Sequence, residues 1–174
     1  GDILHKKGEE QEAFAAYDSC LQWKDDNVMA LNNYAYYLSE KGVDLHKAEA
    51  MSYKTIKAEP NNGTYLDTYA WILFMEERYA DAKTYIDQAL KNRDSTADNS
   101  TVLEHAGDIY YMNGMADESV DFWKKAYTGE NQTEVLAWKI KNRQYITEEE
   151  LKKRNAPKQK PAATKKSVRK GKKK

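Results

Sequence analysis

The side chains in this chain that could carry out chemistry lie too far apart in sequence to form a recognisable site. The three histidines are His5, His46 and His105, and none of them has a Cys or His at the spacing of metal ligands. The single cysteine, Cys20, cannot form an internal disulfide. Neighbouring carboxylates, such as those of residues 148–150, would point apart on a helix instead of converging on one bond. The sequence therefore predicts no catalytic residue, no metal ligand and no cofactor.

Small residues return along the chain at a nearly fixed distance. Four of them, separated by 34, 35 and 37 residues, are Gly1, Ala35, Ala70 and Gly107. Each is followed after twelve or thirteen residues by a second small residue, namely Ala13, Ala48, Ala82 or Ser119. Apolar residues between them recur at helical spacing, without the alternation that is typical of strands. A period of about 34 residues indicates stacked helix pairs, and the small residues would let the paired helices approach closely.

Turn and cap residues mark where these helices are expected to end. Gly8, Gly42 and Gly114 are predicted at the turns inside helix pairs, where a left-handed backbone is needed. Glu77 takes the place of glycine in the third pair, so we expect that turn to be tighter or strained. Three asparagines begin triplets that match the N-glycosylation pattern, but helix capping is favoured because they lie at expected helix starts. They are Asn62, Asn99 and Asn131.

Two stretches of the sequence resemble a known family. They read Leu31-x-x-Tyr34-Ala35-x-x-Leu38 and Leu66-x-x-Tyr69-Ala70-Trp71-x-Leu73. This pattern resembles the tetratricopeptide repeat (TPR) of the bacterial type. The resemblance implies an all-α fold, a right-handed superhelical solenoid of antiparallel helix pairs. The units we expect are a partial first repeat (1–27), three further repeats (28–62, 63–98 and 99–131), a C-terminal capping helix with a short helix (132–154) and a disordered basic tail (155–174).

The segment after the last repeat has its own pattern. Residues 134–140 place apolar side chains on one face, as expected for a helix that caps the last repeat. Thr147 and Glu150 have the spacing of a capping box, which predicts a short helix over 148–154. From Lys152 to Lys174 there are twelve Lys or Arg residues and no acid, so the first 151 residues carry a net charge of −12. A segment as polar and basic as the tail is expected to be disordered.

The resemblance also implies a concave groove, lined by the first helices of the pairs, that binds peptides. We assign groove positions by aligning each repeat of this chain with the family's repeat. These positions include the acids Glu40, Asp67, Glu104 and Asp108 and no Lys or Arg. Chaperone-binding members hold a peptide carboxylate with Lys and Arg, so this sequence favours a neutral or basic partner instead. Asparagines would bond the peptide backbone and aromatic rings would act as anchors, although packing of each ring against a neighbouring helix is the competing interpretation. The predicted contact residues are Met29, Asn32, Asn33, Tyr36, Asp67, Trp71, Met75, Glu104, Asp108 and Tyr111.

The expected function is a non-catalytic protein–protein interaction scaffold, and two alternatives stay open. The basic tail could bind RNA, DNA or anionic lipid through counterion release. The chain could also be the docking arm of a larger enzyme or envelope assembly. No apolar run reaches 18 residues, so no membrane span is predicted. Because the chain begins inside an expected helix, we expect upstream sequence, and any targeting segment, to be missing; the location, bacterial cytoplasm or cell envelope, stays open.

Overall fold

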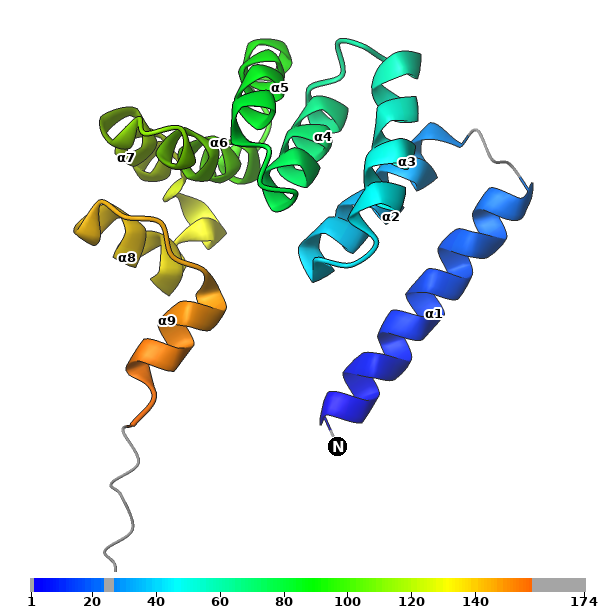
Figure 1. Ribbon diagram of the computed structural model, residues 1–174, viewed down its shortest axis with the longest axis horizontal. Helices are drawn as coiled ribbons and strands as arrows, with labels where there is room; N and C mark the ends of the chain where they lie inside the picture. Colours follow the sequence, from blue (N-terminus) through cyan, green and yellow to red (C-terminus); the bar gives the residue numbers. More distant parts are fainter. Residues whose placement is uncertain (1, 24–26, 158–174) are drawn as a thin grey trace, which may run out of the picture.

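The computed structural model describes residues 2–23 and 27–157, and in them helices are joined by turns and loops, without strands (Figure 1). In chain order the elements are α1 (Asp2–Trp23), α2 (Val28–Lys41), α3 (Leu45–Ala58), α4 (Gly63–Met75), α5 (Tyr79–Asn92), α6 (Ser100–Met112), α7 (Ala116–Ala126), the 3-10 turn η1 (Gly129–Asn131), α8 (Glu134–Asn142) and α9 (Glu148–Asn155). The all-α prediction is confirmed. The predicted disorder and nucleic-acid contacts of the tail fall, from residue 158 onward, outside the described residues.

The helices form a right-handed superhelical stack of antiparallel pairs, as predicted. Helix α2 packs on α3, α4 on α5 and α6 on α7. The first helix of each pair also contacts the first helix of the next pair, α2 with α4 and α4 with α6. The stack curves into an arc that has α1 at one end and α9 at the other (Figure 1). None of the described helices has the length and apolar character that crossing a membrane requires.

The small residues of the repeat lie where two helices cross. Ala35 and Ala70 are fully buried in the first helices of their pairs, and Ala48 and Ala82 in the second helices. The closest crossing is at Gly107, where an added Cβ would lie 2.3 Å from Cδ1 of Trp123. The small residues of the three complete pairs therefore have the role that their spacing predicted. Gly1 lies outside the described residues, and Ala13 lies within the continuous helix α1.

Apolar and aromatic side chains join one pair to the next. The largest cluster includes Leu66, Leu73 and Phe74 from α4 and Ile86 from α5, and it extends to Ile109 on α6. Because this cluster crosses the boundary between the two pairs, the pairs depend on each other for burial, as in other solenoids.

The predicted turn at Gly8 is wrong, since α1 runs as one continuous helix from Asp2 to Trp23. The described part of α1 packs mainly against α2, where Tyr17 stacks on Tyr34 with ring centroids 5.4 Å apart. A reversal at Gly8 would break helical hydrogen bonds without a neighbouring helix to cover the new surface. Glycine inside a helix costs only about 1 kcal/mol relative to alanine, so the helix continues through it.

The other three turns share one backbone geometry. Gly42 and Gly114 adopt φ angles of 65° and 78°, and Glu77 adopts 61° in the same left-handed region. After Glu77, the N–H of Arg78 donates to the carbonyl of Leu73 at 2.9 Å, which is the bond of a Schellman motif. A residue with a Cβ is strained in this conformation, so the predicted strain at Glu77 is confirmed.

Of the three asparagines predicted to cap helices, only Asn62 does so through its side chain. Its Oδ1 accepts from the N–H groups of Thr64 and Tyr65 at 3.0 and 3.2 Å. Asn99 stands at the start of α6, but its amide donates to backbone carbonyls of the preceding loop. The amide of Asn131 likewise donates to a backbone carbonyl, that of Ala126. Asn99 is therefore the N-cap residue of α6 without a side-chain cap bond, and the capping prediction is wrong for Asn131, which ends the 3-10 turn η1.

The C-terminal helices agree with their predictions. Leu136 on α8 is fully buried against Val120, Trp123 and Ala126 of α7, so α8 covers the end of the last pair. Thr147 forms the predicted capping box with Glu150 at the start of α9. Both helices thus begin and end close to the expected positions.

We expect Gly107→Ala to lower the free energy of unfolding by about 2–3 kcal/mol, because its methyl group would overlap the buried ring of Trp123. Urea denaturation followed by circular dichroism measures this change. Gly8→Ala is the matched control, since its Cβ would meet nothing within 4 Å. The control should be neutral or stabilising by up to about 1 kcal/mol. Equal stability of the two variants would contradict the proposed close crossing.

Candidate functional site

The concave face of the arc holds two adjoining cavities that meet at Tyr36. The first, of about 640 Å³, lies between the N-terminal ends of α2, α4 and α6. We call it the amide pocket, after the side chains of Asn32, Asn33, Asn61, Asn62, Asn92 and Asn99 that line it. The second, of about 440 Å³, lies between the following turns of the same helices and α8 and α9. We call it the lysine pocket, because it contains Lys139 beside Glu40, Glu104 and Glu149.

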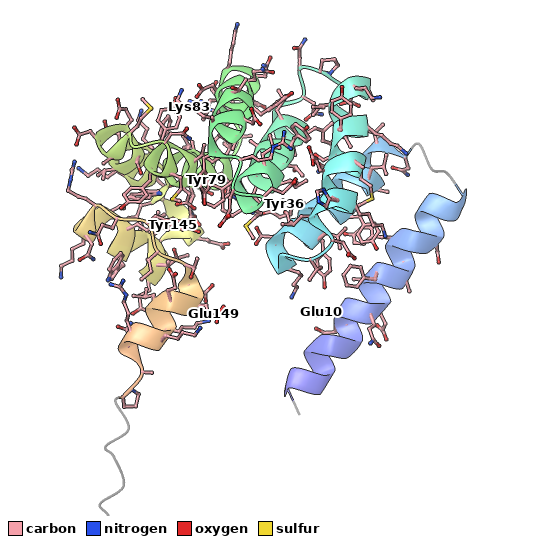
Figure 2. The ribbon with its side chains drawn as sticks, viewed as in Figure 1. Glu10, Tyr36, Tyr79, Lys83, Tyr145 and Glu149 are labelled. Atoms are coloured by element: carbon pink, nitrogen blue, oxygen red, sulfur yellow. The ribbon has the colours of Figure 1, made fainter. Side chains whose placement is uncertain are left out.

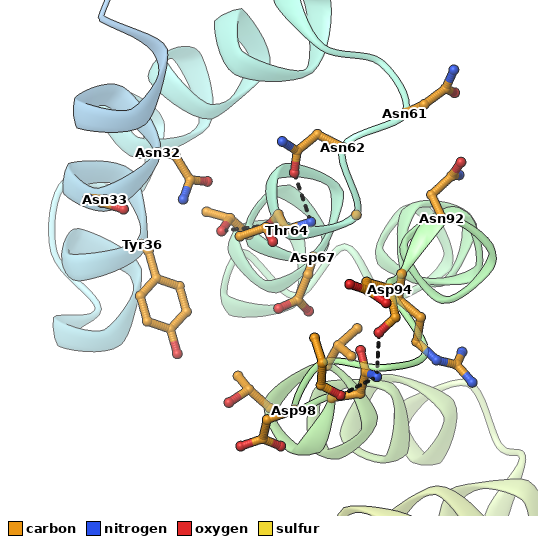
Figure 3. Close-up of a pocket in the computed structure, with 17 residues that line it drawn as sticks. Asn32, Asn33, Tyr36, Asn61, Asn62, Thr64, Asp67, Asn92, Asp94 and Asp98 are labelled. Carbon is orange, nitrogen blue, oxygen red and sulfur yellow. Dashed lines mark hydrogen bonds between the residues drawn. The ribbon is translucent and has the colours of Figure 1, made fainter.

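The amide pocket offers hydrogen-bonding groups from α2. In Figure 3, Asn32 and Tyr36 of α2 and Asp67 of α4 point toward the space between these helices and α6. Asn32 is only 6% exposed, and its Oδ1 is buried without a hydrogen-bond partner among the described residues. Asn33, one residue further on, is exposed. A buried amide without a partner carries a desolvation cost that a bound donor would remove.

Two carboxylates on the far rim of the amide pocket are held in their charged form. Hydrogen bonds from the side chain and backbone of Thr96 lower the pKa of Asp94. The backbone and side chain of Ser100 lower the pKa of Asp98 in the same way. Arg93 also lines this rim, and its guanidinium donates to the carbonyl of Leu90 at 2.9 Å. The rim therefore carries two negative charges and one positive charge at neutral pH.

An aromatic stack contributes to the lining of the lysine pocket. The ring of Trp71 lies between Phe74 and His105, with centroid distances of 4.7 and 4.1 Å. Nδ1 of His105 is 2.9 Å from Oδ1 of Asp67. Burial by itself lowers the pKa of His105, but the charge and hydrogen bond of Asp67, with smaller contributions from Asp108 and Glu40, outweigh it and the net pKa is raised. The stack is therefore held by an ion pair when His105 is protonated.

The lysine pocket contains a buried cation that the sequence analysis did not predict. Lys139 on α8 is 3% exposed, and its Nζ donates to Asp108 at 2.8 Å and to Glu104 at 3.3 Å. Nε1 of Trp123 donates to the same carboxylate of Asp108 at 2.9 Å. Burial raises the pKa of Asp108, and the charge of Lys139 opposes that shift. The groove is thus not free of basic residues, although this one is already bound by two acids.

Two tyrosines stand on facing sides of the lysine pocket. Figure 2 shows Tyr36 on α2 and Tyr145 before α9, with Glu149 at the start of α9. Burial, followed by the charges of Glu40 and Asp67, raises the pKa of the Tyr36 phenol. Burial and the charges of Asp108 and Glu150 raise that of Tyr145. Both phenols therefore stay neutral and keep a proton that can be donated.

Eight of the ten predicted contact residues line one of the two pockets. They are Asn32, Asn33, Tyr36, Asp67, Trp71, Met75, Glu104 and Asp108. Met29 is 64% exposed but borders neither pocket. Tyr111 also borders neither, and its ring packs against Trp123 at a centroid distance of 5.9 Å. For Tyr111 the geometry thus favours the packing interpretation over the anchor.

Lys139 was missed because repeat register assigns groove positions only inside the repeats. The helix that carries it follows the last repeat, and its contribution to the groove depends on how it docks. A signal was present in the sequence, since Lys139 lies three residues after Leu136 and so shares the apolar face of its helix. A charge on such a face indicates a buried pair.

We expect Lys139→Met to lower the free energy of unfolding by about 3–5 kcal/mol, because it leaves the Asp108 carboxylate buried without its cation. Adding Asp108→Asn should restore most of this loss, since asparagine keeps an oxygen for Trp123. Lys141→Met, an exposed site on the same helix, is the control and should change stability by less than about 0.5 kcal/mol. Urea denaturation of wild type, Lys139→Met, Asp108→Asn and the double variant measures the cycle, and a double variant as unstable as Lys139→Met would contradict the pairing.

The raised pKa of His105 predicts a pH-dependent stability. The folded-state pKa lies above the unfolded value of about 6.5, so the stabilising pair with Asp67 is fully present below that value and is lost as pH rises through the folded pKa. Wild type should therefore lose stability relative to Asp67→Asn between about pH 5.5 and pH 9. Urea denaturation at the two pH values measures the difference. A difference that is constant or grows with pH would contradict the assignment.

Sequence comparison relates part of this chain to a named repeat protein. No family model matches the chain. The "TPR repeat-containing protein PA4667" of Pseudomonas aeruginosa is 35% identical over 66 residues, which are 38% of this chain. The same residues span only 11% of that relative's length.

Solved structures agree with this chain in fold at low sequence identity. PilF of Pseudomonas aeruginosa has a TM-score of 0.65 at 16% identity, covering 79% of this chain and 61% of that one. MamA has a TM-score of 0.61 at 17% identity, covering 82% and 81%. YrrB, described as a TPR protein with an unusual peptide-binding site, has a TM-score of 0.59 at 15% identity, covering 72% and 62%. The named relative, the shared fold and the repeating small residues all support the resemblance of this chain to tetratricopeptide-repeat proteins.

Proposed function

We propose that the concave groove binds an extended segment of another protein, mainly in the amide pocket, and that the chain has no catalytic activity of its own. Tetratricopeptide folds serve in general as protein–protein interaction scaffolds. The observation that supports the finer proposal is the amide of Asn32, which is buried beside an open cavity and has an oxygen without a partner among the described residues. A peptide N–H is a donor that suits this oxygen, and an amide side chain can bond a backbone of any sequence.

The neighbouring groups fit the same ligand. Exposed Asn33 supplies a second amide on α2, and the ring of Tyr36, whose phenol is hydrogen-bonded to Glu40, supplies a flat apolar surface. YrrB, which shares the fold, is a protein with a peptide-binding site. In this chain the proposed segment would lie across α2, α4 and α6.

A clamp for a peptide carboxylate is not proposed, because Lys139 in the lysine pocket is already bound and Arg93 stands on a rim that also carries Asp94 and Asp98. Lys139 lies between Asp108 and Glu104, and releasing it would leave a buried carboxylate without a partner. The exposed acids Asp94 and Asp98 stand on the opposite rim. Their charges support a partner that is neutral or basic in the bound segment.

The test begins with selection of peptides from a random display library on the full 174-residue chain. Binding of the selected peptide is then measured by isothermal titration calorimetry. We expect Asn33→Ala and Tyr36→Ala each to weaken binding at least tenfold, about 1.4 kcal/mol, because each removes a contact to the bound segment. Gln88→Ala, an exposed amide on α5, is the matched control and should leave the affinity unchanged.

The proposed charge preference predicts a second result from the same peptide library. Selected sequences should carry more Lys and Arg than Asp and Glu. Unchanged affinity of both groove variants, with their helical content intact by circular dichroism, would contradict the groove assignment. Enrichment of acidic peptides would contradict the charge preference alone.

A further inference from the structure

We propose that His46, Glu49 and Glu76 form a binding site for a divalent transition-metal ion of the Zn²⁺ type. Each of the three offers a ligand atom, and these atoms all lie within 4.8 Å of one another. His46 and Glu49 are one turn apart on α3, so they share a face of that helix. Glu76 comes from the residue that ends α4. None of the three lines either pocket of the groove, so the site does not rest on the proposed peptide binding.

The two carboxylates of this cluster lie close together, and the guanidinium of Arg78 donates to Glu49. Glu49 and Glu76 lie close enough to repel each other when both are charged. Burial, followed by the charge and hydrogen bond of Glu49, raises the pKa of Glu76. Oε1 of Glu76 is buried without a hydrogen-bond partner among the described residues. A proton shared by the two carboxylates would remove only their repulsion. A bound cation would remove the repulsion and would also give Oε1 of Glu76 a partner.

Surrounding residues already hold Glu49 in place. Nη1 of Arg78 donates to its Oε1 at 2.8 Å, and the hydroxyl of Tyr69 lies 3.4 Å from the same atom. The other guanidinium nitrogen of Arg78 bonds Asp81 at 3.1 Å. These contacts fix the position of the Glu49 carboxylate beside His46 and Glu76. Outer contacts of this kind orient metal ligands and strengthen binding.

The donor set selects the class of ion. Ca²⁺ and Mg²⁺ favour sites made of oxygen ligands, whereas an imidazole nitrogen suits Zn²⁺ and its neighbours. Tetrahedral ligands at 2.0–2.2 Å from zinc lie about 3.4 Å from one another, so side chains whose ligand atoms lie within 4.8 Å would close by at most about 1.4 Å. Three protein ligands leave a fourth position for water. The ion would join α3 to the turn after α4, and so would link two successive helix pairs.

This cluster could not be predicted from the sequence, because the partners of His46 are carboxylates and one of them, Glu76, comes from another helix. Ligand spacing along the chain detects sites made by neighbouring residues. Here the spacing between His46 and Glu76 is set by the packing of α3 on α4.

The test is a calorimetric titration of the untagged full chain with Zn²⁺, with Ca²⁺ and Mg²⁺ titrated in parallel. We expect one Zn²⁺ per chain and no comparable binding of Ca²⁺ or Mg²⁺. His46→Gln and Glu76→Gln should each weaken Zn²⁺ binding at least about tenfold. Glu77→Gln is the matched control, because it removes the same charge from the next, exposed residue. Zn²⁺ should also raise the melting temperature of wild type and of Glu77→Gln, but not that of the other two variants.

Three results would overturn the proposal. Absence of Zn²⁺ binding would mean that the carboxylates share a proton only. Binding that is unchanged in His46→Gln and Glu76→Gln would place the ion elsewhere on the chain. Equal weakening in Glu77→Gln would mean a general attraction to negative charge. Circular dichroism without metal distinguishes each of these from unfolding of a variant.

Discussion

The close crossing of α6 and α7 at Gly107 is the contact on which the C-terminal half of the groove depends. Because position 107 has no side chain, the ring of Trp123 lies directly on the backbone of α6 and is fully buried. From that position its Nε1 reaches Asp108. Asp108 in turn binds Lys139, which fixes α8 against α6. The wall of the lysine pocket thus depends on the absence of a Cβ at Gly107, the residue before Asp108 on α6.

The buried ions make this arrangement specific at an energetic cost. Removing Lys139 and Asp108 from water costs several kcal/mol per ion, and their attraction offsets this only when the remaining hydrogen bonds are made. Trp123 and Glu104 supply those bonds. An apolar pair would allow α8 to slide or rotate on α6, whereas the hydrogen bonds of the ion pair can form in only one arrangement of the two helices. We infer that the pair fixes the groove's shape more than it adds to stability.

The repeating small residues made most of the fold predictable, because close helix crossings need Gly, Ala or Ser at fixed intervals. Ala70 and Ala82 could be placed at their crossing from spacing alone. Gly8 could not, because a glycine in a turn and a glycine inside a helix look alike until neighbouring helices are known. Lys139 and the partners of His46 were missed for a related reason. Each is brought into place by contacts between helices that no repeat register describes.

The distribution of charge in the groove separates two levels of recognition. The interior acids Asp67 and Asp108 each contact a basic side chain, so they add little to the field that an approaching protein meets. The unpaired negative charge lies instead on the exposed rim, where salt screens it beyond about 8–10 Å. Rim charges of this kind act mainly on the rate of encounter and on the exclusion of acidic partners. Amides below the rim can bond any extended backbone. In the proposed complex the amides would therefore select an extended conformation, and the charged rim would select against acidic partners.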